Sequence, residues 1–97
     1  MPSTDETIDI ENAGNTVPLR LQGADTLTLV IEGDNAADYA VDVRTRQGTW
    51  RKGVGASYTA STDYDDVRNS GADELRVRCT NGTGTGGDQA TITLMAN

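Results

Sequence analysis

Residues Glu74–Asn97 read ELRVRCTNGTGTGGDQATITLMAN, which places two alternating runs on either side of a glycine-rich segment. The segment Gly82–Gly87 matches G-x-G-x-x-G, a pattern that can mark a dinucleotide-binding loop. Such a loop needs a strand before the glycines and a helix after them, because the helix N-terminus binds the pyrophosphate. Here Ala90–Asn97 alternates apolar residues with threonine and predicts a strand instead. We therefore expect a flexible connection between two antiparallel strands, and no nucleotide site.

The same alternation extends through most of the chain. Successive side chains of a strand point to opposite faces, so a period of two is typical of a half-buried strand. Tyr39, Val41 and Val43 share one face of such a run, and Asp42 and Arg44 share the other. The expected strands cover residues 7–11, 17–21, 26–31, 39–44, 49–51, 57–60, 64–67, 74–79 and 90–97.

Turn residues separate these runs, and patterns typical of helices are nearly absent. RQG, residues 46–48, predicts a tight hairpin, and Pro18 predicts that its strand lies at an edge or is bulged. We expect one all-β domain over residues 7–97, a β-sandwich (jelly-roll-like) or small barrel of about eight short, mostly antiparallel strands. Residues 1–6 are polar and include Pro2, so we expect an N-terminal arm that pairs with the edge of a neighbouring copy.

The charge balance bears on the partners. Eight basic residues face fifteen acidic ones, for a formal net charge of −7. No basic block forms a stripe that could follow a phosphate backbone, so we expect neither nucleic acid nor an acidic membrane as a partner. The N-terminus has no apolar segment of a secretion signal, and we expect synthesis in the cytoplasm.

The kind of acidity is also informative. Aspartate outnumbers glutamate eleven to four, arginine outnumbers lysine seven to one, and threonine occurs fourteen times. Short, strongly hydrated carboxylates with few large apolar residues suit a protein that must stay soluble in concentrated salt, where charge repulsion is screened. This composition favours a halophilic source, and the alternative is an ordinary acidic domain.

Few residues could carry chemistry. The chain has no histidine and one cysteine, which leaves no zinc set and no common general base, so we expect no enzyme and no cofactor. Asp63, Asp65 and Asp66 have part of the spacing of a calcium loop, but its glycine and its distant glutamate are missing, so a solvated acidic turn is the alternative. Asn81 begins an N-x-T sequon and is a candidate glycosylation site.

The aromatic residues offer a further clue, because a row of exposed rings could stack on sugars. The chain has one tryptophan, three tyrosines and no phenylalanine. Tyr39 and Cys79 each lie on the same face of a predicted strand as its apolar residues, so both are expected in the core. Trp50 follows the predicted hairpin and is expected either to cover the core or to anchor a contact, together with Arg51 and Lys52.

Three segments, YAVDVRTRQGTWRKG, ASYTASTDYDDV and ELRVRCTNGTGTGGDQATITLMA, together resemble small structural proteins of tailed viruses that infect halophilic archaea. The resemblance covers about residues 39–96 and contains no catalytic motif. It implies a small all-β virion component, of the capsid decoration, turret or head-associated type, and it assigns no functional residue.

Together these observations predict a virion protein that decorates or stabilises a head as a trimer or pentamer. Its partners would be copies of itself and the major capsid protein, and Pro2, Thr4, Trp50, Arg51 and Lys52 are the candidate contact residues. The alternative is a β-sandwich module that binds carbohydrate or another ligand at the host surface. A Trp50 covered by protein favours the first function, and a Trp50 exposed beside other rings favours the second.

Overall fold

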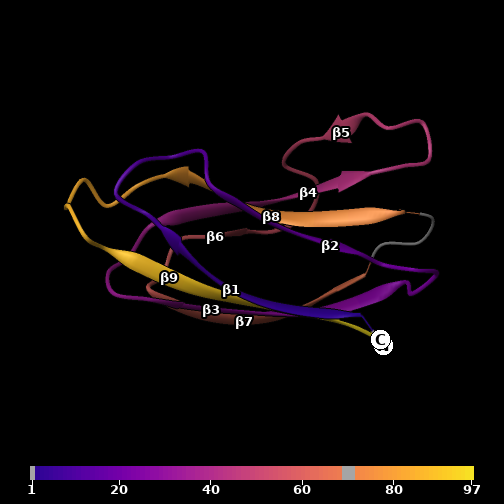
Figure 1. Cartoon of the computed structure of the whole chain (residues 1–97), viewed down its shortest axis with the longest axis horizontal. Coiled ribbons are helices and arrows are strands. Elements are labelled where there is room, and N and C mark those ends of the chain that lie inside the picture. Colours follow the sequence, from indigo (N-terminus) through magenta and orange to yellow (C-terminus); the bar gives the residue numbers. More distant parts are fainter. Residues whose placement is uncertain (1, 69–71) are drawn as a thin grey trace.

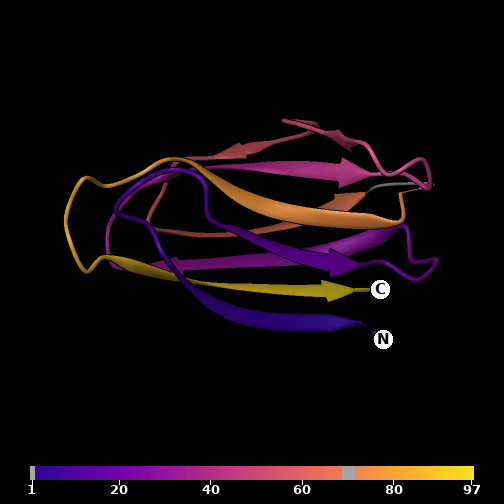
Figure 2. The ribbon, with the colours of Figure 1, turned by 45° about the horizontal axis from the view of Figure 1, so that its top comes forward.

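The computed structural model describes residues 2–68 and 72–97. Within these residues the chain forms two antiparallel sheets and no helix, so nothing described could cross a membrane as a helix. The sheets lie face to face, as the two views of the ribbon show (Figures 1 and 2). The fold is a small β-sandwich, as the alternating pattern predicts.

The first sheet has the order β1-β9-β3-β7 and the second the order β2-β8-β4-β5, with β6 paired to β4. Their bounds are β1 Ser3–Asp9, β2 Thr16–Arg20, β3 Thr26–Gly33, β4 Asp38–Arg44, β5 Trp50–Arg51, β6 Ser57–Tyr58, β7 Thr62–Arg68, β8 Glu74–Asn81 and β9 Gln89–Ala96.

The core lies between the inward faces of the two sheets. Leu27, Leu29 and Ile31 of β3 alternate with outward residues, which is why the sequence pattern predicts this strand correctly. Strand β3 pairs with both β7 and β9 and is central. Tyr39 and Cys79 are buried as expected, and β2, which contains Pro18, pairs only with β8 and is an edge strand.

The N-terminal segment differs from the expected arm. Strand β1 begins at Ser3 and pairs with β9 along its whole length, from Ser3 opposite Met95 to Asp9 opposite Gln89. The N–H of Ala96 also donates to the carbonyl of Pro2. These polar residues add little to the core, so backbone hydrogen bonds to β9 are what hold them to their own chain.

The glycine-rich connection also differs from the expected simple link. Strands β8 and β9 do not pair with each other, because each already lies between two other strands. The connection therefore carries the chain from one sheet to the other, and it is hydrogen-bonded to the segment after β1. Thr83 N–H donates to Ile10 O, and Gly84 N–H donates to Glu11 O.

Candidate functional site

The outward face of the second sheet carries four of the eight basic residues of the protein. The pairing registers of β2, β4, β5 and β8 place one set of side chains on this face, which we call the arginine face: Arg20, Asp42, Arg44, Trp50, Glu74, Arg76 and Arg78. The strands of the second sheet carry five arginines and three carboxylates, and those of the first sheet carry one arginine and seven carboxylates. The two sheets therefore differ in the sign of their charge.

Asp42 is the centre of the arginine face. The pattern of β4 places it opposite the core, where solvent is expected, but it is fully buried. Its carboxylate accepts hydrogen bonds from Nε of Arg76 and Nε of Arg78, both at 2.8 Å, and from the N–H of Gly53 at 2.9 Å. The chain between β5 and β6 thus passes close to Asp42, which explains its burial.

These contacts fix the charge of Asp42. Burial alone would raise the pKa of this carboxyl, but the hydrogen bonds from Arg78, Arg76 and Gly53 outweigh it and lower the pKa to about 2. The hydrogen bond to Asp42 raises the pKa of Arg78 in turn. The network therefore keeps Asp42 ionised and holds Arg76 and Arg78 beside it.

Trp50 stacks against this network. The guanidinium carbon of Arg76 lies 4.1 Å from the centre of the Trp50 ring, and that of Arg44 lies 5.7 Å away. The ring is half-buried and its neighbours are cations, so it neither covers the core nor joins a row of rings. Arg44 forms an ion pair with Glu74, and its Nε is buried with no hydrogen-bond partner in the described structure.

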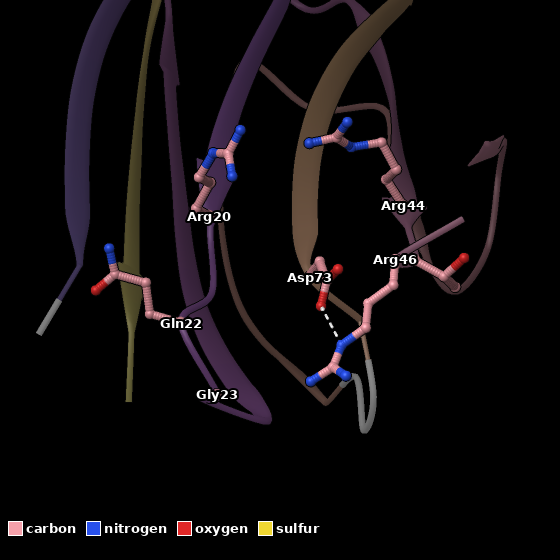
Figure 3. Close-up of a pocket in the computed structure, with 7 residues that line it drawn as sticks. Arg20, Gln22, Gly23, Arg44, Arg46 and Asp73 are labelled. Carbon is pink, nitrogen blue, oxygen red and sulfur yellow. Dashed lines mark ion pairs between the residues drawn. The ribbon is translucent and has the colours of Figure 1, made fainter. Parts of the chain in front are cut away.

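A pocket opens at one end of the arginine face (Figure 3). It has a volume of about 380 Å³ and is lined by Arg20, Gln22, Gly23, Arg44, Thr45, Arg46 and Asp73. Arg20 ends β2, Arg44 ends β4, and Arg46 lies in the β4–β5 hairpin. Figure 3 shows the Arg46 side chain extending towards Asp73, with 3.9 Å between Nε and the nearer carboxylate oxygen.

The outward face of the first sheet is different in character. It presents threonines from β1, β3, β7 and β9, together with two large exposed side chains, Tyr64 (65% exposed) and Met95 (40% exposed). Asp5, Asp9 and Glu32 lie on this face as well. Tyr64 and Trp50 therefore occupy opposite faces of the sandwich.

The calcium candidates do not converge. Asp66 points outward and accepts a hydrogen bond from Thr28 at 2.7 Å, whereas Asp65 points the other way and accepts one from Tyr58 at 2.7 Å. Asp63 accepts from the N–H of Tyr64. In residues 2–68 and 72–97 no group of three potential ligands is close enough to hold a metal ion.

Of the other candidate residues, Arg51 ends β5 and Lys52 follows it, and both are exposed beside the arginine face. Pro2 and Thr4 are half-buried against β9 of the same chain. Asn81 is exposed at the end of β8, where its side chain lies 3.4 Å from Asp38.

The glycine pattern has a packing role. A Cβ atom at Gly82 would collide with the backbone carbonyl of Glu11 and lie 2.8 Å from the Cα of Asn12. Only glycine allows the two backbones to approach so closely. At Gly86, by contrast, the nearest atom to an added Cβ is the side-chain Oε1 of Glu11 at 3.5 Å.

Comparison with known proteins gives a fold and no family. No family model matches the chain, and no curated protein matches it. Among solved structures, the SPBc2 prophage-derived protein YomS superposes with a TM-score of 0.71 at 14% identity, over 100% of this chain and 96% of that one.

Two further solved structures share the fold. The Yersinia pseudotuberculosis-derived mitogen has a TM-score of 0.62 at 10% identity, over 98% of this chain and 84% of that one. A family 29 carbohydrate-binding module, solved with mannohexaose, has a TM-score of 0.52 at 14% identity, over 84% of this chain and 61% of that one. The sandwich is thus shared by a prophage-derived protein and by carbohydrate-binding modules.

Proposed function

We propose that this chain is a non-catalytic structural protein of a virus head, which decorates or stabilises the head through contacts with copies of itself and with the major capsid protein. The observation that carries the proposal is the end-to-end fold match with a protein encoded by a prophage. The match extends over 100% of this chain and 96% of that one, so it includes both sheets of the sandwich.

The arginine face supports a role in protein contacts. It presents arginines around Trp50, and arginine and tryptophan are enriched among the hot-spot residues of protein interfaces. The Asp42 network holds Arg76 and Arg78 in place, so little conformational freedom is lost when a partner binds. The acidic composition, with aspartate dominant, supports a virus of a halophilic host.

Mass spectrometry of purified particles tests this proposal. The chain should be present in particles that have been washed in high salt. Its copy number should correspond to three or five copies at each symmetric position of the head. Added protein should also bind isolated heads that lack it. Its absence from particles, with no binding to heads, would refute the proposal.

The second candidate function is binding of carbohydrate at a host surface. The fold of the carbohydrate-binding module and the exposed Tyr64 on a threonine-rich face favour it. Against it, Trp50 is stacked on arginines at the other face, so the tyrosine lacks a second ring beside it. Calorimetry with mannohexaose separates the two functions. Binding that disappears in Tyr64→Ala, with Trp50→Ala unchanged, would support the carbohydrate module.

A further inference from the structure

We propose that the pocket lined by Arg20, Arg44 and Arg46 binds a carboxylate group, and that this group belongs to the acidic sheet of a second copy of the chain. The inference rests on the proposed homo-oligomeric function and assigns it a site. The pocket would hold the contact that joins one copy to the next.

The donors of the pocket are only partly used within the chain. Arg20 is exposed and forms no ion pair with the residues that the structure describes. Arg46 lies 3.9 Å from Asp73, which is too far for a hydrogen bond, and its side chain is 92% exposed. Arg44 pairs with Glu74, yet its Nε has no partner. Guanidinium donors therefore remain available around a cavity of about 380 Å³.

The charge of the pocket selects the anion. The pocket is lined by three guanidinium groups, of which Arg44 pairs with Glu74 and Arg46 lies near Asp73, so a surplus of one positive charge remains. One carboxylate balances that surplus, and its planar shape matches the guanidinium fork. A phosphate group with nearly two negative charges would exceed that surplus of one positive charge, and a nucleic-acid backbone would exceed it further.

A second copy supplies such groups. Its first sheet carries seven carboxylates and one arginine on its strands, and Asp5, Asp9, Glu32 and Asp66 are exposed on the outward side. The pocket and these carboxylates lie on different parts of each molecule. The contact is therefore head-to-tail, a type that closes into a ring when the rotation between copies divides a full turn.

Variants of the two exposed arginines test the site. Arg20→Gln and Arg46→Gln each remove one donor group and leave the Arg44–Glu74 pair in place, so both should fold. Asn12→Asp is the matched control, because Asn12 is exposed between β1 and β2, outside the pocket and outside the strands of the first sheet, and the substitution makes the same change in net charge. Sedimentation equilibrium should give a self-dissociation constant at least tenfold higher for the pocket variants, and one within twofold of the wild type for the control.

Competition identifies the occupant. A hexa-aspartate peptide should dissociate the wild-type assembly, and inorganic phosphate at the same ionic strength should not. A wild-type protein that stays monomeric at high concentration, or pocket variants that associate like Asn12→Asp, would overturn the inference, as would dissociation by phosphate alone. The head-binding assay is separate. If the chain is found in particles but its Arg20→Gln variant associates normally, the proposed role of the pocket is refuted and the proposed function stands.

Discussion

Replacing Asp42 by asparagine removes the charge at the centre of the arginine face and keeps the size of the side chain. In the folded protein the carboxylate is fully buried and holds Arg76, Arg78 and the N–H of Gly53. The asparagine can still accept some of these hydrogen bonds, but it leaves two guanidinium groups without a counter-charge. We therefore expect the folded state to lose stability.

The size of the loss follows from two independent routes. The pKa of Asp42 falls from 3.8 to about 2 on folding, which corresponds to about 2 kcal/mol of stability from the charged form. Breaking a fully buried ion pair costs about 3–5 kcal/mol, but Arg76 and Arg78 are 17% and 23% exposed and can be partly rehydrated. We expect about 2–3 kcal/mol, or a fall in Tm of roughly 10–20 °C for a domain of this size.

Thermal and urea unfolding followed by circular dichroism measure the loss. Asp5→Asn is the matched control, since it makes the same change in net charge at an exposed position, and its stability should stay within about 0.5 kcal/mol of the wild type. An Asp42→Asn protein as stable as this control would refute the reasoning, because the buried carboxylate would then contribute nothing to stability beyond its effect on the net charge.

Three other predictions concern salt, acid and the glycine connection. With a net charge of −7 on a small core, the Tm should rise as salt increases from low millimolar to molar, and a constant Tm across that range would exclude a halophilic adaptation. Because the folded pKa of Asp42 lies below its unfolded value, its contribution should be complete above about pH 4 and should be lost as the pH falls towards 2, so the difference in stability between the wild type and Asp42→Asn should shrink in that window. Gly82→Ala should destabilise the protein by about 2 kcal/mol or more, because its Cβ meets backbone atoms, whereas Gly86→Ala meets only the flexible end of Glu11 and should cost less than half as much; equal losses in urea unfolding would contradict the packing role.

The sequence is sufficient to predict most of the strands and their inward faces. The alternation in β3, β4 and β8 is local information, and each strand buries the residues that the period of two selects. The hairpin after Arg44 and the edge position of Pro18 are also local, because they depend on turn chemistry and on a missing N–H donor.

Features that depend on distant parts of the chain could not be predicted in the same way. Alternation correctly gives the side of the sheet for Asp42, but nothing in β4 says that the segment after β5 passes over it. The nearest signal is the pair Arg76 and Arg78, two residues apart on one face of a strand. The pairing of residues 3–6 with β9 leaves no apolar pattern in the sequence either, because backbone hydrogen bonds form it. The arginine pocket joins three segments whose order in space is set by the topology.

The order of the strands has a consequence for synthesis on the ribosome. Strand β9, the last of the nine described strands along the chain, lies between β1 and β3, and β8 lies between β2 and β4. Until both have emerged, the strand that joins β1 to β3 and the strand that joins β2 to β4 are missing. The apolar faces of these four strands then stay open to solvent. Neither sheet can therefore close before its late central strand has left the ribosome, and chains with so many distant pairings fold slowly. Open intermediates would then accumulate during synthesis, and the net charge of −7 would help to keep them apart.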